Sequence, residues 1–245
     1  GHWRTGFALS HGEIGRLYML ATLASAACLP WLGKIVDVLP AHRVLLLVMP
    51  TLAGATVLAA SAPSLAALAL ALFQLRLFGQ GMMTHIALTA TGRWFEARRG
   101  RAISLVVLGH QAGEATLPLA FAFLVTFVGL RSAWLACGAL LLLLGLPLAY
   151  RAFRVPRRPL PAEQPENGDR ELPSARQWTR GEVLRDRLFW LLLLGVLAPP
   201  FVGTTIFYHQ DHLTVLRGWS PTHYAASLSL MAMTTVVFEI GRAHV

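Results

Sequence analysis

Apolar stretches long enough to cross a membrane recur along the chain, and short polar or basic segments separate them. A helix needs roughly 20 mainly apolar residues to cross a hydrocarbon core of about 30 Å. Seven stretches match or begin this pattern, at residues 15–36, 41–61, 64–92, 101–128, 132–150, 187–209 and from Pro221 onward. The pattern therefore predicts an all-α fold, a polytopic membrane helical bundle.

Several of these helices have start signals in the sequence. Ser64 and Ser220 stand where N-cap residues are expected, and Pro221 would take the first helical position, where a missing N–H costs nothing. Thr179 and Glu182 have the spacing of a capping box. We therefore expect a helix to begin before the apolar stretch at 187–209.

The composition supports a membrane protein. Of the 245 residues, 55% are hydrophobic and 13% are charged, which is too apolar for an ordinary soluble domain. The net charge is +9, but the basic residues flank apolar stretches and form no stripe interleaved with aromatics, so nucleic acid is excluded as a partner. Cys28 and Cys137 lie inside apolar stretches without metal-binding spacing. We expect a lipid bilayer around the chain, and no metal, cofactor or obligate protein partner.

Lysine and arginine are shared unevenly between the two ends of the segments. Fifteen fall in the loops after residues 36, 92 and 150, and four, at positions 4, 16, 131 and 217, fall on the opposite side. By the positive-inside rule the first three loops are cytoplasmic. The expected localisation is a cell (inner) membrane, crossed several times.

A polar segment divides the apolar stretches into two groups. Residues 153–186 contain five prolines and too few apolar residues to bury a core, which is typical of a linker. It would separate an N-terminal bundle at 1–152 from the start of a C-terminal bundle at 187–238. Residues 239–245 interrupt the last apolar stretch, and we interpret them as adapter read-through at the end of a fragment.

Polar residues occur inside two of the apolar stretches. Arg76 and Gln80 lie in the third, and His110, Gln111 and Glu114 lie in the fourth. Gln80 and Glu114 are each thirteen residues from the basic end of their stretch, about 20 Å deep at helical rise. Ionisable side chains at such depth usually face a bundle interior or a wet cavity, so these residues are candidate functional residues.

Short motifs accompany this order of segments. Gly33, Asp37 and Arg43 stand between the first and second segments, the third carries Arg76-Leu-Phe-Gly-Gln-Gly81, and the fourth carries Gly109-His-Gln-Ala-Gly113. With the basic loop at 93–101 and the long central linker, the chain resembles the major facilitator superfamily, whose members have twelve helices in two halves. The visible segments correspond to family helices 2 to 8, a partial major facilitator fold. The phrases at 99–104 and 184–190 are similar to the monocarboxylate and oxalate/formate porter branch.

The resemblance implies roles for several residues. Gly33, Asp37, Arg43 and Arg93 would form a conformational motif with an Asp37–Arg93 ion pair. The loop departs from the family pattern at Val38 and Pro40, where the family prefers a basic residue and a glycine. Close helix packing is expected at four glycines, Gly79, Gly81, Gly109 and Gly113.

The polar residues allow both functional and structural interpretations. Arg76 offers a fork of donors to a carboxylate substrate, or it forms an ion pair with Glu114. Glu114 is a candidate proton site, and His110 is a candidate relay or a packing partner. Tyr208 and His209 either line an outer mouth or form a solvated interfacial cluster.

The function that fits these features is secondary transport of a small organic anion of the monocarboxylate kind, coupled to a proton as in a symporter, by alternating access. Efflux of drugs or amphiphiles is the alternative within transport, and the buried charge of Arg76 disfavours cationic cargo. An intramembrane enzyme is disfavoured because no G-x-S-x-G, H-E-x-x-H or paired-Asp motif is present. A seven-helix receptor would match the number of segments alone.

Overall fold

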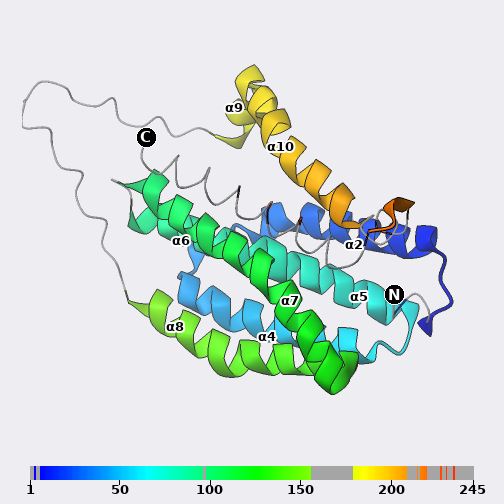
Figure 1. Cartoon of the computed structure of the whole chain (residues 1–245). Coiled ribbons are helices and arrows are strands. Elements are labelled where there is room, and N and C mark those ends of the chain that lie inside the picture. The colour runs from blue at the N-terminus through cyan, green and yellow to red at the C-terminus, as the bar shows by residue number, and fades with distance from the viewer. Residues whose placement is uncertain are drawn as a thin grey trace, which may run out of the picture. The chain divides into compact units, whose positions relative to one another are not determined.

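The computed structural model describes residue 3, residues 6–95, 98–155 and 179–208, and beyond them residues 214, 216–219, 227, 230 and 234. Within this part of the chain all regular elements are helices (Figure 1). The described residues up to 155 form one compact unit, here unit 1, and those from 179 to 234 belong to a second, unit 2. The predicted all-α fold is confirmed.

Unit 1 begins with α2 (His11–Leu32) and the short α3 (Ile35–Val38). Ser10 caps α2, because its side chain accepts a hydrogen bond from the backbone N–H of Glu13 while the Glu13 carboxylate accepts from the N–H of Ser10. Pro40 then leads into α4 (Ala41–Ser61), whose bounds are those predicted from the apolar pattern.

The third predicted segment is one continuous helical stretch built of three elements. It comprises α5 (Leu65–Gln74), the π-helix η1 (Leu75–Met82) and α6 (Met83–Trp94). Ser64 is the N-cap, as predicted, because its hydroxyl accepts a hydrogen bond from the backbone N–H of Ala67. The π-helical stretch was not predicted, and it contains both Arg76 and Gln80.

The fourth and fifth segments follow as α7 (Arg99–Leu140), the π-helix η2 (Leu141–Gly145) and α8 (Leu146–Arg154). Within α7, Gly129 has φ 77° and ψ 162°, which is not helical, so α7 consists of two helices that meet there. A positive φ is strained for side chains other than that of glycine. The break coincides with the boundary that the sequence predicted between residues 128 and 132.

Five helical stretches of the described structure are long and apolar enough to cross a membrane. They are His11–Val38, Ala41–Ser61, Leu65–Trp94, Ala120–Arg154 and Arg187–Ile206. The predicted segment at 101–128 is helical but is not a separate candidate for a membrane span. The predicted segment from Pro221 lies outside the regular elements of the described residues, and so does the suspected read-through at 239–245.

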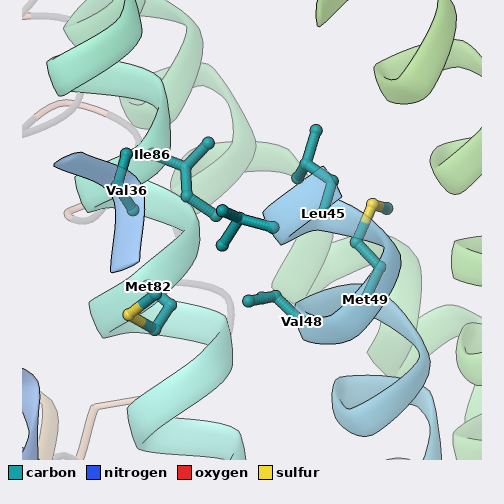
Figure 2. Close-up of a cluster of buried hydrophobic side chains, with 7 residues drawn as sticks. Val36, Leu45, Val48, Met49, Met82 and Ile86 are labelled. Carbon is teal, nitrogen blue, oxygen red and sulfur yellow. The ribbon is translucent and has the colours of Figure 1, made fainter. Parts of the chain in front are cut away.

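The core of unit 1 lies between α4 and the stretch formed by η1 and α6. Figure 2 shows Leu45, Val48 and Met49 of α4 packed beside Met82 and Ile86, with Val36 of α3 nearby. Each of these six side chains is at most 2% exposed. Helix α4 also contacts α5, α7 and α8, so it is the most enclosed helix of unit 1.

Two glycines that the sequence analysis did not single out allow the close approach of α4 to its other neighbours. A Cβ at Gly138 would lie 3.4 Å from the carbonyl oxygen of Ala53 and closer still to the Thr56 hydroxyl. A Cβ at Gly145 would lie 3.1 Å from the terminal methyl of Met49. Small residues at helix contacts of this kind permit the backbone packing that drives association in membranes.

Unit 2 contains α9 (Arg180–Arg185) and α10 (Arg187–Tyr208). The predicted capping box is confirmed, because the Thr179 side chain accepts a hydrogen bond from the Glu182 N–H and the Glu182 carboxylate accepts from the N–H of Thr179. Asp186 separates the two helices, and its carboxylate accepts a hydrogen bond from the N–H of Leu188. A helix, α9, thus begins before the apolar stretch, as predicted. It ends at Arg185, and a separate helix, α10, begins at Arg187.

We expect the substitution Gly138→Leu to lower the free energy of unfolding by roughly 1–3 kcal/mol, because the new side chain meets the α4 backbone and Thr56. Unfolding by SDS in mixed detergent micelles measures the change. Gly109→Leu is the matched control, since a Cβ there meets nothing within 4 Å. Equal stability of the two variants would contradict the close α4–α7 contact.

Candidate functional site

Arg93, at the end of α6, joins that helix to α3 through two contacts. Its Nη2 lies 2.6 Å from Oδ1 of Asp37, which is the ion pair expected from the sequence. Its Nη1 donates a 3.0 Å hydrogen bond to the backbone carbonyl of Val36. We call this arrangement of Arg93, Asp37 and Val36 the Arg93 clasp. The side chains of the ion pair are 51% and 59% exposed, so solvent screens the charge interaction.

The hydrogen bond to Val36 has a cause in the local sequence. In a helix the carbonyl of Val36 would accept from the N–H of residue 40, but residue 40 is proline and has no N–H. Val36 is only 2% exposed, so water does not replace that donor. Arg93 supplies it, because an unsatisfied buried carbonyl is costly. The departure of Pro40 from the family pattern thus gives Arg93 a second role beside the ion pair.

His85 adds a third contact between the same elements, and the sequence analysis missed it. Its Nε2 lies 3.2 Å from the carbonyl oxygen of Gly33. A Cβ at Gly33 would lie 3.1 Å from the same ring nitrogen, so only glycine fits here without displacement. His85 and Arg93 are eight residues apart, which places both on one face of the helix, and that shared face is the signal that could have indicated the contact.

Arg76 lies half-buried in η1, near the middle of its membrane segment. Its Nη1 donates a hydrogen bond to Oε1 of Gln80, and its guanidinium carbon lies 5.3 Å from the ring centroid of Tyr18 on α2. Stacking of this kind is a cation–π interaction. Tyr18 was not predicted as a site residue, because nothing in its local sequence reveals the distant contact.

Glu114 and His110 pair with each other on α7, one turn apart. His110 Nε2 lies 3.4 Å from Glu114 Oε1, and the two side chains are 49% and 57% exposed. The alternative in which Arg76 forms an ion pair with Glu114 is wrong for this structure, because neither side chain has the other as a partner within the described residues. The reason is topological: α7 packs on α4 and α6, and Arg76 points to Tyr18 of α2.

The remaining predicted residues are scattered. Gln111 is half-buried on α7, and Arg43 is exposed in the first turn of α4 with no side-chain partner among the described residues. Tyr208 ends α10, but its side chain and the whole of His209 lie outside the described residues.

The four predicted packing glycines differ from one another. A Cβ at Gly79 would lie 3.3 Å from the Leu52 side chain, and a Cβ at Gly81 would lie 3.1 Å from that of Leu29. Within the described structure a Cβ at Gly109 meets nothing within 4 Å, and one at Gly113 meets only Leu117 of its own helix. The expected helix contacts are therefore present at Gly79 and Gly81 and absent at the other two positions.

The helical fold and its five candidate spans are those of a multi-pass membrane protein, and the half-buried Arg76 lies inside one of these spans. A family model of the Major Facilitator Superfamily matches residues 2–243. The chain belongs to that superfamily of secondary transporters and not to an enzyme family. The match does not distinguish between branches of the superfamily. Comparisons with curated proteins and with solved structures gave no match.

We expect Arg93→Met to lower the free energy of unfolding by about 1–3 kcal/mol, because it leaves the buried Val36 carbonyl without a donor. Asp37→Asn keeps that hydrogen bond and removes only a half-exposed ion pair, so its expected cost is below about 1 kcal/mol. SDS titration of both variants measures the difference. A larger loss for Asp37→Asn would show that the ion pair, and not the carbonyl, is the important contact.

Proposed function

We propose that the protein transports a small organic anion of the monocarboxylate kind together with a proton, by alternating access. In this proposal Arg76 binds the carboxylate of the substrate, and Glu114 with His110 carries the proton. The first three basic loops, after residues 36, 92 and 150, face the cytoplasm, following the distribution of Lys and Arg.

The proposal is carried by the uncompensated charge of Arg76. Within the described residues its contacts are the neutral amide of Gln80 and the neutral ring of Tyr18, and it has no carboxylate partner. A cation inside a membrane span is costly unless an anion or water stabilises it. A substrate carboxylate would supply the missing negative charge, so binding would be strongest for anions.

The geometry around Arg76 leaves its donors available. The guanidinium carbon of Arg76 lies over the Tyr18 ring, whose neutral face is not a carboxylate and leaves the charge of Arg76 uncompensated. One of the Arg76 N–H donors is occupied by Gln80. The others can form the bidentate pair that arginine makes with carboxylates. The π-helical η1 fits such a role, because π-helical turns are frequent at functional sites.

The Glu114–His110 pair supports proton coupling. His110 Nε2 and Glu114 Oε1 lie 3.4 Å apart, so a proton can pass between them without a large movement. Protonation of Glu114 removes its negative charge and so weakens its attraction for His110, whereas protonation of His110 creates a cation that the Glu114 carboxylate attracts. This would let the pair respond to the proton gradient while Arg76 responds to the substrate.

The Arg93 clasp and the His85–Gly33 contact supply a conformational element. Both join α6 to the segment from α2 to α3, through two hydrogen bonds to backbone carbonyls and one half-exposed ion pair. A two-state equilibrium needs contacts that are made in one state and lost in the other. We propose that these contacts are intact in one of the two access states.

Uptake of radiolabelled lactate into proteoliposomes with an inward proton gradient tests the assignment in the full-length transporter. We expect Arg76→Gln to lower uptake by at least about tenfold, because the substrate loses a charged hydrogen-bond partner. Arg76→Lys keeps the charge but not the fork, so its loss should be smaller. Glu114→Gln should abolish the dependence of uptake on the proton gradient and leave exchange of lactate across the membrane.

Arg217→Gln is the matched control, since Arg217 is an exposed arginine outside the proposed site. Undiminished uptake in both Arg76→Gln and Glu114→Gln would remove the assignment. Competition by a lipophilic cationic dye, without competition by other carboxylates, would favour efflux of amphiphiles instead.

A further inference from the structure

A cavity of about 320 Å³ lies in unit 1, at the end of the bundle remote from the Arg93 clasp. Its walls come from the segment before α2, from the last residues of α4 and from α7 just after the break at Gly129. The lining residues are Trp3, Gly6, Phe7, Ala59, Ala60, Ser61, Ala62, Leu130, Arg131 and Trp134. This volume lies in the range of small-molecule sites. None of the residues proposed for transport lines it.

Two tryptophans fix the aromatic wall of the cavity. The rings of Trp3 and Trp134 stack with centroids 5.8 Å apart and an interplanar angle of 28°. Phe121 packs edge-on against Trp134 at 5.2 Å. Trp3 Nε1 donates a 3.2 Å hydrogen bond to the carbonyl of Ala59, one of the C-terminal carbonyls of α4 that lack a helical partner. These contacts pack the rings of the wall against one another, and the wall presents flat apolar surface.

Trp134 carries an unsatisfied donor at this wall. Its Nε1 is buried and has no hydrogen-bond partner within the described residues. A buried N–H without an acceptor costs free energy comparable to a lost hydrogen bond, and such groups often belong to sites that a ligand or water completes. Because this nitrogen is buried, an acceptor oxygen in the cavity would satisfy it once the indole ring turned toward the cavity.

Arg131 supplies a positive charge beside the same cavity. It is exposed, and it has no ion-pair partner within the described residues. Arg131 and Trp134 are three residues apart in the first turn after Gly129, so they share one helix face. The N-terminal end of that helix adds a partial positive charge, which offsets the partial negative charge at the C-terminal end of α4. The net field at the cavity is then that of the guanidinium.

From these features we infer a second binding site, for a small amphipathic carboxylate. The apolar body of the ligand would lie on the Trp3–Trp134 wall, and its carboxylate would accept hydrogen bonds from Arg131 and, after a turn of the indole ring, from Trp134 Nε1. The site goes beyond the proposed transport function, because it requires neither Arg76 nor Glu114 and is located at the opposite end of α4 from the Arg93 clasp.

Isothermal titration calorimetry of the full chain in nanodiscs of zwitterionic lipid tests the site, with empty nanodiscs as the blank. The probes are 2-naphthylacetate, the neutral 2-naphthylacetamide and the cationic 2-naphthylethylamine. We expect the acid to bind at least about tenfold more tightly than the amide, and Arg131→Gln to remove that difference. Trp134→Phe keeps the ring and loses the donor, so it should weaken binding of the acid severalfold.

Arg217→Gln should leave the affinity for 2-naphthylacetate unchanged, and the preference for the acid over the amide should persist in Arg76→Gln, which separates this site from the proposed transport site. Arg131 is exposed, so its replacement does not threaten folding; near-ultraviolet circular dichroism checks that Trp134→Phe retains the packing. Equal binding of acid and amide, tighter binding of the amine, or affinity that neither variant alters would each overturn the inference.

Discussion

The burial of α4 is the constraint on which the rest of unit 1 depends. In a membrane, lipid tails are as apolar as leucine, so helices associate through close packing and not through exclusion of water. Helix α4 satisfies this with large buried side chains such as Leu45 and Met49, and with small ones such as Ala53 and Ala59. Gly138 completes the contact on the α7 side. The positions of α5, α7 and α8 therefore depend on how closely each helix can approach α4.

This packing leaves polar backbone groups at both ends of α4 that require partners. Before α4 begins, Pro40 deprives the Val36 carbonyl of its helical donor, and Arg93 supplies one. At the other end Trp3 donates to the carbonyl of Ala59. Both contacts join segments 56 or 57 residues apart in the sequence. The backbone groups that the hydrocarbon cannot satisfy are thus also the points at which distant elements are joined.

The sequence predicted the features that depend on local rules. Residues 41–61 were predicted as a helix and are one, Ser64 and Thr179 cap the helices that follow them, and the chain breaks at Gly129 where a boundary was expected. Each of these depends on apolar period, hydrogen-bonding side chains or glycine geometry within a few residues.

The features that the sequence did not predict depend on tertiary packing. The π-helical stretch η1 contains Gly79 and Gly81, but glycines also occur within the α-helices of this chain, so they do not identify a π-helix. The contacts of Arg76 with Tyr18 and of His85 with Gly33 require knowledge of which helices are neighbours. The Arg76–Glu114 ion pair was incorrect for the same reason, because which helices are neighbours was unknown. Equal depth in two segments says nothing about the direction in which a side chain points. The Asp37–Arg93 pair was predictable because a family motif supplied the missing tertiary information.

The π-helical stretch has a mechanical consequence for the whole third span. Arg76 and Arg93 stand on one unbroken helical axis, 17 residues and roughly 25 Å apart. If η1 tightened to α-helical pairing, each residue drawn out of the wide turn would twist everything beyond it by about 100°. His85 and Arg93 would then rotate away from Gly33 and Asp37, although the cause of the rotation lies in η1 and not near these residues. A change of hydrogen-bond pairing within η1 would in this way move the far end of the helix without any hinge.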